Sequence, residues 1–222
     1  MAGQAISSLH FNCFVIFNLL FSFLLLSRVL GLGDLGANGM PIPIGKLNLY
    51  IAGAGIHPQR VLPVVLDLGT NSQKLIDNPL YLGLQQPRPA DPEFFELVDE
   101  MMSAFRNRWP NVLVQFEDFS NPHAWQLLSK YRNKHLMFND DIQSTGTIAL
   151  AGLLASLRSR NKPLKSIVNE RIVCVGAGSA GLGVCETIVR CMVDEGLDYD
   201  RARANFWVMD EHGLIGHTRQ NM

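Results

Sequence analysis

The sequence predicts an α/β protein built from a parallel sheet followed by a βαβ unit. Two observations predict this class. After residue 28, short apolar runs alternate with longer amphipathic runs, a pattern typical of parallel strands joined by crossover helices. Near residue 176, the pattern G-x-G-x-x-G stands between an apolar run and a helical pattern, as in the glycine-rich turn of a Rossmann-type domain.

The expected elements follow one another without an internal repeat. A valine-rich strand at 61–68 is closed by Gly69, Thr70 and Asn71. Asp91 and Pro92 suit the N-cap and first position of a helix that ends before Pro110. The remaining elements are strands at 112–116, 135–138, 171–176 and 205–210, and helices at 121–131, 145–157 and 181–192.

Composition excludes several classes of protein. The chain has 222 residues, of which 47% are hydrophobic and 18% charged, as in globular rather than disordered proteins. A formal net charge of -1 provides no basic footprint for nucleic acid. The four cysteines show no metal-ligand spacing and suggest no disulfide framework.

The apolar stretch at 11–26 differs from everything that follows it. It is short for a membrane span, and no basic residue precedes it as in a secretory signal. We interpret it as a segment not native to the fold. We therefore expect no membrane partner, although the sequence leaves an anchor formed by residues 11–26 open.

The second glycine pattern, GAGSAG at 176–181, has the context of a dinucleotide-binding turn. A helical pattern follows it, and the next strand ends in an acid that suits a ribose hydroxyl pair. The separation exceeds the usual ~20 residues, so residues 193–204 would form an insertion. The candidate cofactor residues are Gly176, Gly178, Ser179, Gly181 and Asp210.

The first glycine pattern, GLGDLG at 31–36, is interpreted as a coincidental match. Pro41 and Pro43 lie where a crossover helix would run, and proline breaks helix interiors. Its glycines would instead allow close backbone packing. Lys46 follows, either as a solvated helix end or as a desolvated base.

Two acid pairs follow neighbouring strands. Glu117 and Asp118 follow the strand at 112–116, and Asp140 and Asp141 follow the strand at 135–138. Parallel strands bring these ends to one edge, where without a cation at least one acid would take up a proton. Carboxylate oxygens suit Mg²⁺ or Mn²⁺. Solvated loop acids remain the alternative.

Several segments together resemble the malic enzyme family, and GAGSAG is similar to the turn of that family's cofactor domain. The segments are RVLGLGDLGANGMPIPIGKLNLY (28–50), RVLPVVLDLGTNSQKLIDNPLYLGLQQPR (60–88), VQFEDF (114–119) and FNDDIQSTG (138–146). The resemblance implies oxidative decarboxylation of malate to pyruvate and CO₂, with reduction of NAD or NADP and a divalent metal. The acid at Asp210 would repel a 2′-phosphate and so favours NAD.

The resemblance also implies residue roles. Lys46 would be the catalytic base with Asp140 beside it, and Arg28 would bind a substrate carboxylate. Glu117, Asp118 and Asp141 would be the metal ligands. The family's tyrosine, the final proton donor, would precede Arg28, yet residues 1–27 contain no tyrosine.

We therefore expect a malic-enzyme-like chain truncated at both ends. The predicted division is an apolar leader at 1–27, a partial substrate and metal domain at 28–160, and a partial NAD(P)-binding Rossmann domain at 161–222. The alternative is a catalytically inactive fragment acting as a metal- or nucleotide-binding or subunit-interaction module. A metal-free NAD-dependent dehydrogenase is disfavoured by the acid pairs. The family implies a homodimer or homotetramer, in mitochondria or the cytoplasm.

Overall fold

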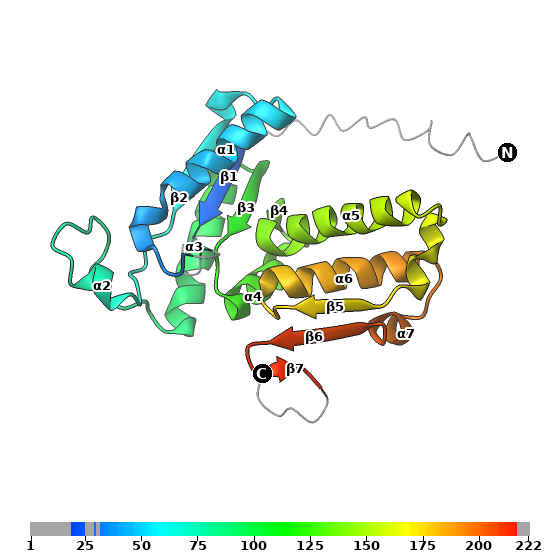
Figure 1. The fold of residues 1–222 in the computed structure, drawn as a ribbon. Helices are drawn as coiled ribbons and strands as arrows, with labels where there is room; N and C mark the ends of the chain where they lie inside the picture. The colour runs from blue at the N-terminus through cyan, green and yellow to red at the C-terminus, as the bar shows by residue number, and fades with distance from the viewer. Residues whose placement is uncertain (1–18, 25–28, 30–31, 217–222) are drawn as a thin grey trace.

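The strands form two sheets in the computed structural model, which describes residues 19–24, 29 and 32–216 (Figure 1). The first sheet has the order β2-β1-β3-β4 and all its pairs are parallel. In the second, β5 pairs with β6 in parallel and β7 joins antiparallel. The strands are β1 (Leu19–Leu24), β2 (Val61–Val65), β3 (Val112–Glu117), β4 (Met137–Asn139), β5 (Ile172–Val175), β6 (Phe206–Asp210) and β7 (Gly213–Leu214). The predicted α/β class is confirmed.

Helices connect these strands. The α-helices are α1 (Pro41–Ala54), α2 (Gln73–Ile76), α3 (Asp91–Arg108), α4 (Asn121–Tyr131), α5 (Thr145–Ser159), α6 (Ser179–Asp194) and α7 (Tyr199–Arg203). Three 3₁₀ turns, η1 (Gly36–Gly39), η2 (Pro58–Arg60) and η4 (Leu164–Asn169), and a π-helical turn, η3 (Asp140–Ser144), complete the described chain. Figure 1 shows α5 and α6 side by side, with α6 next to β5.

β1 occupies a central position that the sequence analysis did not predict. Leu19 pairs with Val112 of β3, and Leu20 pairs with Val61 of β2. A central strand of a parallel sheet often reads as an uninterrupted apolar run, which gives no alternation to recognise. Residues 19–24 of the apolar stretch therefore belong to the sheet, and the interpretation of the stretch as a segment not native to the fold is wrong for these residues. The division at residue 27 stays a prediction.

α1 corrects the expectation that prolines would prevent a helix after the first glycine pattern. The helix begins at Pro41, so Pro41 and Pro43 lie in its first turn, where no intrahelical N–H donor is lost. It ends at Gly55, whose φ of 67° is left-handed. The expected close packing is present at Gly36, where an added Cβ would lie 2.0 Å from Tyr81 Oη.

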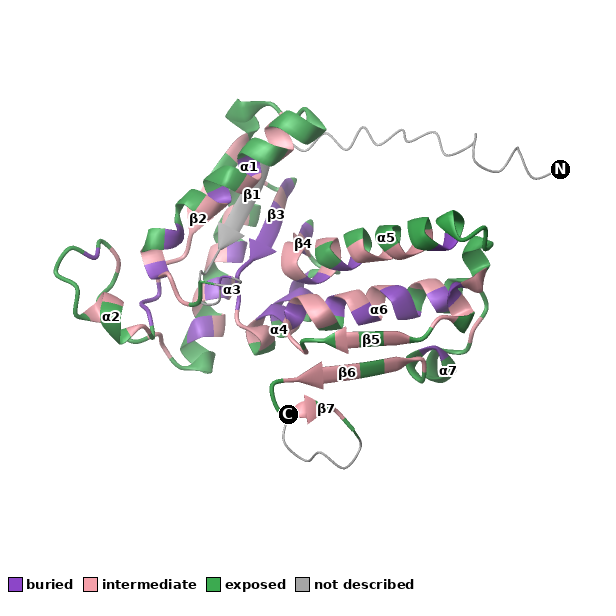
Figure 2. Cartoon of the chain, viewed as in Figure 1, coloured by how far each residue is buried: buried purple, intermediate pink, exposed green. Residues whose placement is uncertain are grey.

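Two apolar cores support the two sheets. The first packs α3 and α4 against β3, with Phe94, Val98, Met102, Phe116 and Leu127 almost fully buried. The second packs α5, α6 and α7 together, with Leu157, Ile167, Ile188, Val189, Met192 and Ala202. Figure 2 shows β3 buried along most of its length, whereas β5 has exposed positions.

No helix in the described ranges is both long and apolar enough to cross a membrane.

Candidate functional site

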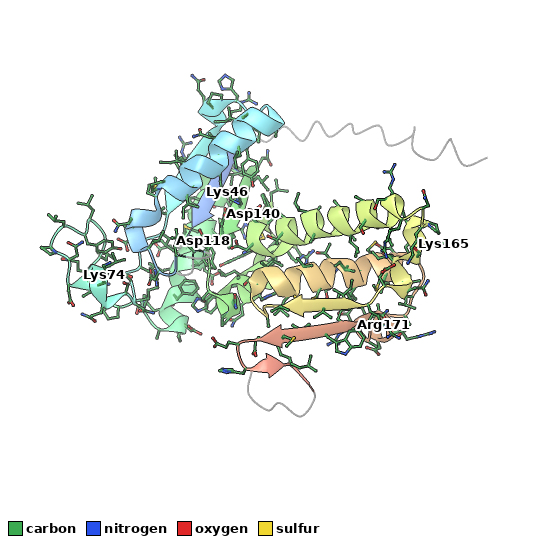
Figure 3. All side chains as sticks on the ribbon, viewed as in Figure 1. Lys46, Lys74, Asp118, Asp140, Lys165 and Arg171 are labelled. Atoms are coloured by element: carbon green, nitrogen blue, oxygen red, sulfur yellow. The ribbon has the colours of Figure 1, made fainter. Side chains whose placement is uncertain are left out.

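The two predicted acid pairs lie together at the carboxyl edge of the first sheet. β3 ends at Glu117 and β4 ends at Asn139, and Phe116 pairs with Asn139 in the ladder. Continuing this register by one residue places Glu117 next to Asp140, and by two residues places Asp118 next to Asp141. Figure 3 shows Lys46, Asp118 and Asp140 in one region beneath α1.

Lys46 of α1 enters this acid cluster from the helix above the sheet. Its Nζ lies 2.8 Å from Glu117 Oε1 and forms an ion pair with Asp140 Oδ2. The lysine side chain is 31% exposed, whereas the Glu117 side chain is 7% exposed. The cation is thus held between a carboxylate of β3 and one of the turn η3, and it is not a solvated helix end.

Asp118 and Asp141 form a second contact on the same edge. The backbone N–H of Asp118 donates to Asp141 Oδ2 at 2.8 Å. Asp118 is buried and has a φ of 58°, in the left-handed region that costs most residues about 1 kcal/mol or more. Such a conformation persists only where neighbouring structure fixes it.

The turn η3 gives the adjacent acids different partners. Asp140 faces Lys46, whereas Asp141 faces the backbone of Asp118. The turn is closed by Asn139, whose Oδ1 accepts from Ile142 N at 2.9 Å, and by Gln143, whose Oε1 accepts from Asn139 N at 2.9 Å. Single π-helical turns within or beside α-helices are frequent at functional sites.

Burial and mutual repulsion change the acidity of the cluster. Burial raises the pKa of Glu117 to about 7, although the Lys46 contact opposes the shift. Burial and the charge of Asp141 raise the pKa of Asp118 to about 7, and burial also raises that of Asp141. Burial alone would lower the pKa of Lys46, but Asp140 and Glu117 raise it. The acids therefore favour an additional positive charge or a proton.

Two residues that the sequence analysis did not identify complete the cluster. Gln115 Nε2 donates to Glu117 Oε2 at 2.6 Å, and Gln115 is fully buried. Tyr50 lies one helical turn after Lys46, and burial, reinforced by the charge of Asp140, raises its pKa to about 12. The two-residue spacing of Gln115 and Glu117 on a strand was a usable signal, because it places both on one face.

The donor chemistry of the cluster fits a divalent cation. Glu117, Asp118 and Asp141 offer hard oxygen ligands. Burial, followed by the charges of neighbouring carboxylates, raises the pKa of each of these acids, and a cation would offset both effects. Among the described residues, however, no group of three or more His, Cys, Asp or Glu side chains is gathered closely enough to hold a metal ion.

The second glycine pattern forms the predicted turn between β5 and α6. Gly176 has a φ of 118°, which favours glycine. A Cβ on Gly181 would lie 2.0 Å from the Gly176 carbonyl oxygen, so only glycine allows this close approach. Gly178 is the N-cap of α6, and Ser179 begins the helix.

A cavity of about 270 Å³ joins this turn to the acid cluster. Asp141 and Phe119 line one side, and the residues of the glycine turn line the other. Asn121 of α4 also lines it, and its Oδ1 accepts from Ser179 N at 2.9 Å and from Ser179 Oγ at 2.7 Å. No local sequence pattern predicts this contact.

Asp210, the predicted ribose-binding acid, lies on the second sheet. Asp210 ends β6, and its Oδ1 accepts from His212 N at 2.8 Å. Met209 pairs with Val175, so Asp210 stands on the strand adjacent to the glycine turn. Arg28 lies outside the described residues.

The fold and this site define an α/β protein that places a buried acid and lysine cluster beside a dinucleotide-type glycine turn. Comparison with protein families gives the same domain order. The family model "Malic enzyme, N-terminal domain" matches residues 26–132, and "Malic enzyme, NAD binding domain" matches residues 142–222. The chain belongs to the malic enzyme family.

Individual relatives agree with this assignment. A hydrogenosomal malic enzyme of Neocallimastix frontalis is 54% identical over 196 residues, which are 88% of this chain and 33% of the relative. An NADP-dependent malic enzyme of Dictyostelium discoideum is 52% identical, over 87% of this chain and 35% of the relative. The crystal structure of Entamoeba histolytica malic enzyme matches with a TM-score of 0.63 and 25% identity, over 91% of this chain and 35% of that one. The chain thus spans about a third of the length of these relatives.

Proposed function

We propose that this chain carries the acid and lysine chemistry of oxidative malate decarboxylation, which yields pyruvate and CO₂ and reduces NAD(P). The observation that carries the proposal is the Lys46 ammonium group, held between Glu117 and Asp140. Asp141 of the same cluster lines a cavity shared with the glycine turn of α6. A substrate in that cavity would lie between Asp141 of the acid cluster and the cofactor turn.

Lys46 is the group best placed to take the hydroxyl proton of malate. In the present arrangement its two carboxylate partners keep it protonated. Neutralising the charge of Glu117 would leave Asp140 as its main partner and lower the lysine pKa towards the range of a general base. Asp140 would then orient Lys46 and stabilise the proton it accepts.

Glu117, Asp118 and Asp141 would hold Mg²⁺ or Mn²⁺. When bound, such an ion supplies Lewis-acid stabilisation of negative charge on the substrate oxygen. The raised pKa values of the three acids support this assignment, because a bound cation would favour their ionised forms. Gln115 would keep the Glu117 carboxylate oriented through its 2.6 Å hydrogen bond.

The glycine turn at 176–181 would bind the dinucleotide at the N-terminus of α6, with NAD preferred over NADP. The preference rests on Asp210 at the end of the adjacent strand, because a carboxylate repels a 2′-phosphate. Arg28 as the substrate-carboxylate ligand, assembly into a homodimer or homotetramer, and a mitochondrial or cytoplasmic location stay predictions from the family resemblance.

The direct test is malate-dependent reduction of NAD and NADP by the purified chain with Mn²⁺. Lys46→Met should lower the rate about 100-fold or more, as expected for loss of a general base. Lys74→Met, on the exposed side of α2, is the matched control and should leave the rate unchanged. A Lys46→Met variant as active as the control would contradict the proposal.

Mn²⁺ binding gives a second readout that does not depend on turnover. Electron paramagnetic resonance of free Mn²⁺ should show weaker binding by Asp141→Asn than by the unchanged chain. Mn²⁺ binding without turnover would instead favour the inactive binding module. Equal Mn²⁺ affinity of Asp141→Asn and the unchanged chain would show that Asp141 is not a metal ligand.

A further inference from the structure

A second, larger cavity lies at the opposite edge of the first sheet from the acid cluster. Its volume is about 510 Å³, and it is lined by the start of β3 and the residues that lead into β4. Buried Met102, Val112 and Val114 contribute apolar lining. Arg106, Arg132 and Lys134 also line the cavity, and all three are exposed.

The ionised side chains that line this cavity are all cationic. No Asp or Glu lines it, although the whole chain has 19 Lys and Arg against 20 Asp and Glu. Within the described part of the chain, no carboxylate lies within 4.0 Å of Arg106, Arg132 or Lys134. Lys130 shows the contrast, because its Nζ lies 2.5 Å from Asp99 Oδ2.

His135 reports the electrostatic effect of these cations. It lines the cavity, and its ring stands edge-on to Tyr131 with 5.5 Å between centroids. Burial, followed by the charges of Arg106 and Lys134, lowers the pKa of His135, and the charge of Asp99 only partly opposes the shift. Arg106 and Lys134 therefore disfavour a further positive charge at His135, which lines the cavity.

The loop that carries three of these residues is held by its own backbone. The N–H groups of Lys134 and His135 both donate to the Tyr131 carbonyl oxygen, at 2.8 and 2.9 Å. Val114 N donates to the Leu136 carbonyl oxygen at 2.9 Å, which joins the loop to β3. The backbone that carries the basic side chains is therefore already ordered, which reduces the conformational entropy lost on binding.

We infer that this basic cavity binds the phosphate group of a small phosphorylated anion. Arginine guanidinium groups match phosphate oxygens in a bidentate geometry, and a nearby lysine adds a further positive charge. Two arginines and one lysine around an apolar floor suit a phosphate dianion better than a single carboxylate. This site is separate from malate chemistry, because it lies beyond the amino ends of β3 and β4.

The test is an NMR titration of the full chain with inorganic pyrophosphate, which reads two sites separately. Resonances of the His135 ring and the Lys134 amide should shift and saturate. The Gly178 and Ala180 amides report any binding at the glycine turn instead. The double variant Arg132→Gln/Lys134→Gln should raise the dissociation constant at His135 about tenfold or more, because bonds to charged groups are lost.

The matched control is Arg171→Gln/Lys165→Gln, which removes the same charges from exposed positions outside the cavity (Figure 3). It should leave the affinity at His135 unchanged. Arg106→Gln on α3 provides an independent variant if the double variant unfolds at a lower temperature. The inference is overturned if His135 does not respond to millimolar pyrophosphate, or if all variants bind as the unchanged chain does.

Discussion

Asp34 and Arg88 form an ion pair that joins the chain before α1 to the loop before α3. Arg88 Nη2 lies 2.8 Å from Asp34 Oδ1, and Nη1 lies 2.5 Å from Oδ2. The backbone N–H groups of Gly36 and Asn71 donate to the same carboxylate. Both side chains are at most 15% exposed, so removal of one partner would leave the other charge buried.

We expect Asp34→Asn to lower the free energy of unfolding at pH 7 by about 3 kcal/mol, because breaking a buried pair leaves Arg88 unpaired. Burial opposes the shift, but Arg88 and Asn71 hold the pKa of Asp34 below its usual value of 3.8. A depressed pKa stabilises the fold above the unfolded pKa, and this contribution is lost as pH falls through the folded pKa.

Urea unfolding at neutral pH and at progressively lower pH measures both effects. The variant should lose less stability than the unchanged chain between neutral pH and pH values below the folded pKa of Asp34. The control is Asp77→Asn. Asp77 is exposed and accepts a hydrogen bond from Gln73, so this change should alter stability by less than about 0.5 kcal/mol at pH 7. Parallel stability curves for Asp34→Asn and the unchanged chain would refute the role of the pair.

Some contacts of the candidate site could be predicted from the sequence, whereas others could not. The meeting of the two acid pairs followed from strand order and the carboxyl-edge rule. The contact of Lys46 with Asp140 joins residues 94 positions apart, which no local pattern specifies. Their proximity was suggested only by the family resemblance. Tyr50 was missed because α1 was not predicted, and Asn121 was missed because its partner Ser179 belongs to the second sheet's helix.

At the scale of elements, two glycines bring η3 and α5 against α6. A Cβ on Gly183 of α6 would lie 2.2 Å from the Ile142 carbonyl oxygen. A Cβ on Gly146 of α5 would lie 2.2 Å from Thr187 Oγ1. The turn that carries the acid pair is therefore in backbone contact with the helix that begins at the glycine turn.

We expect Gly183→Ala to destabilise the chain by about 1 to 3 kcal/mol, because the new methyl group must displace the backbone of η3. Gly152→Ala is the control, since Gly152 is an exposed position of α5 and nothing lies within 4 Å of its Cβ position. Replacing that helical glycine should stabilise by about 0.5 to 1 kcal/mol. Thermal unfolding followed by circular dichroism measures both variants, and similar melting of the two would contradict the proposed contact.

The elements differ in how far the sequence specified them. α3, α4, α5 and α6 were predicted because each has a helical apolar period or a clear start signal. α3 begins at Asp91, one residue earlier than the N-cap assignment required, with Ala90 as the cap. The short elements α2, α7 and β7 carry too few residues to show a period, and β1 lacks alternation.

At the scale of the whole molecule, one face of the second sheet is uncovered in the described structure. α6 packs against the sheet on one side, whereas Val173 is 63% exposed and its ladder partner Trp207 is 39% exposed (Figure 2). Val175 is 81% exposed on the same strand. Contiguous exposed apolar side chains on an edge strand favour association between chains.

We expect the chain to self-associate with rising concentration through this face, and Val173→Lys to weaken the association by placing a charge on the edge strand. Sedimentation velocity over a concentration series measures the effect. Leu80→Lys, in a loop where Leu80 is 83% exposed, is the matched control and should leave association unchanged. A monomer at every concentration would show that the exposed face does not mediate association between chains.

The π-helical turn η3 also limits how the chain tolerates a change in length. An α-helix turns about 100° per residue, so deletion of one residue between 140 and 144 would rotate α5 by that angle relative to β4. The close contact between Gly146 and Thr187 would be lost. Asp140, which pairs with Lys46, would point towards a different element. Substitutions within this segment can preserve the arrangement, whereas a single deletion would alter both the acid cluster and the contact with α6. The number of residues in η3 therefore constrains the arrangement of the acid cluster and α6, in addition to their chemical identity.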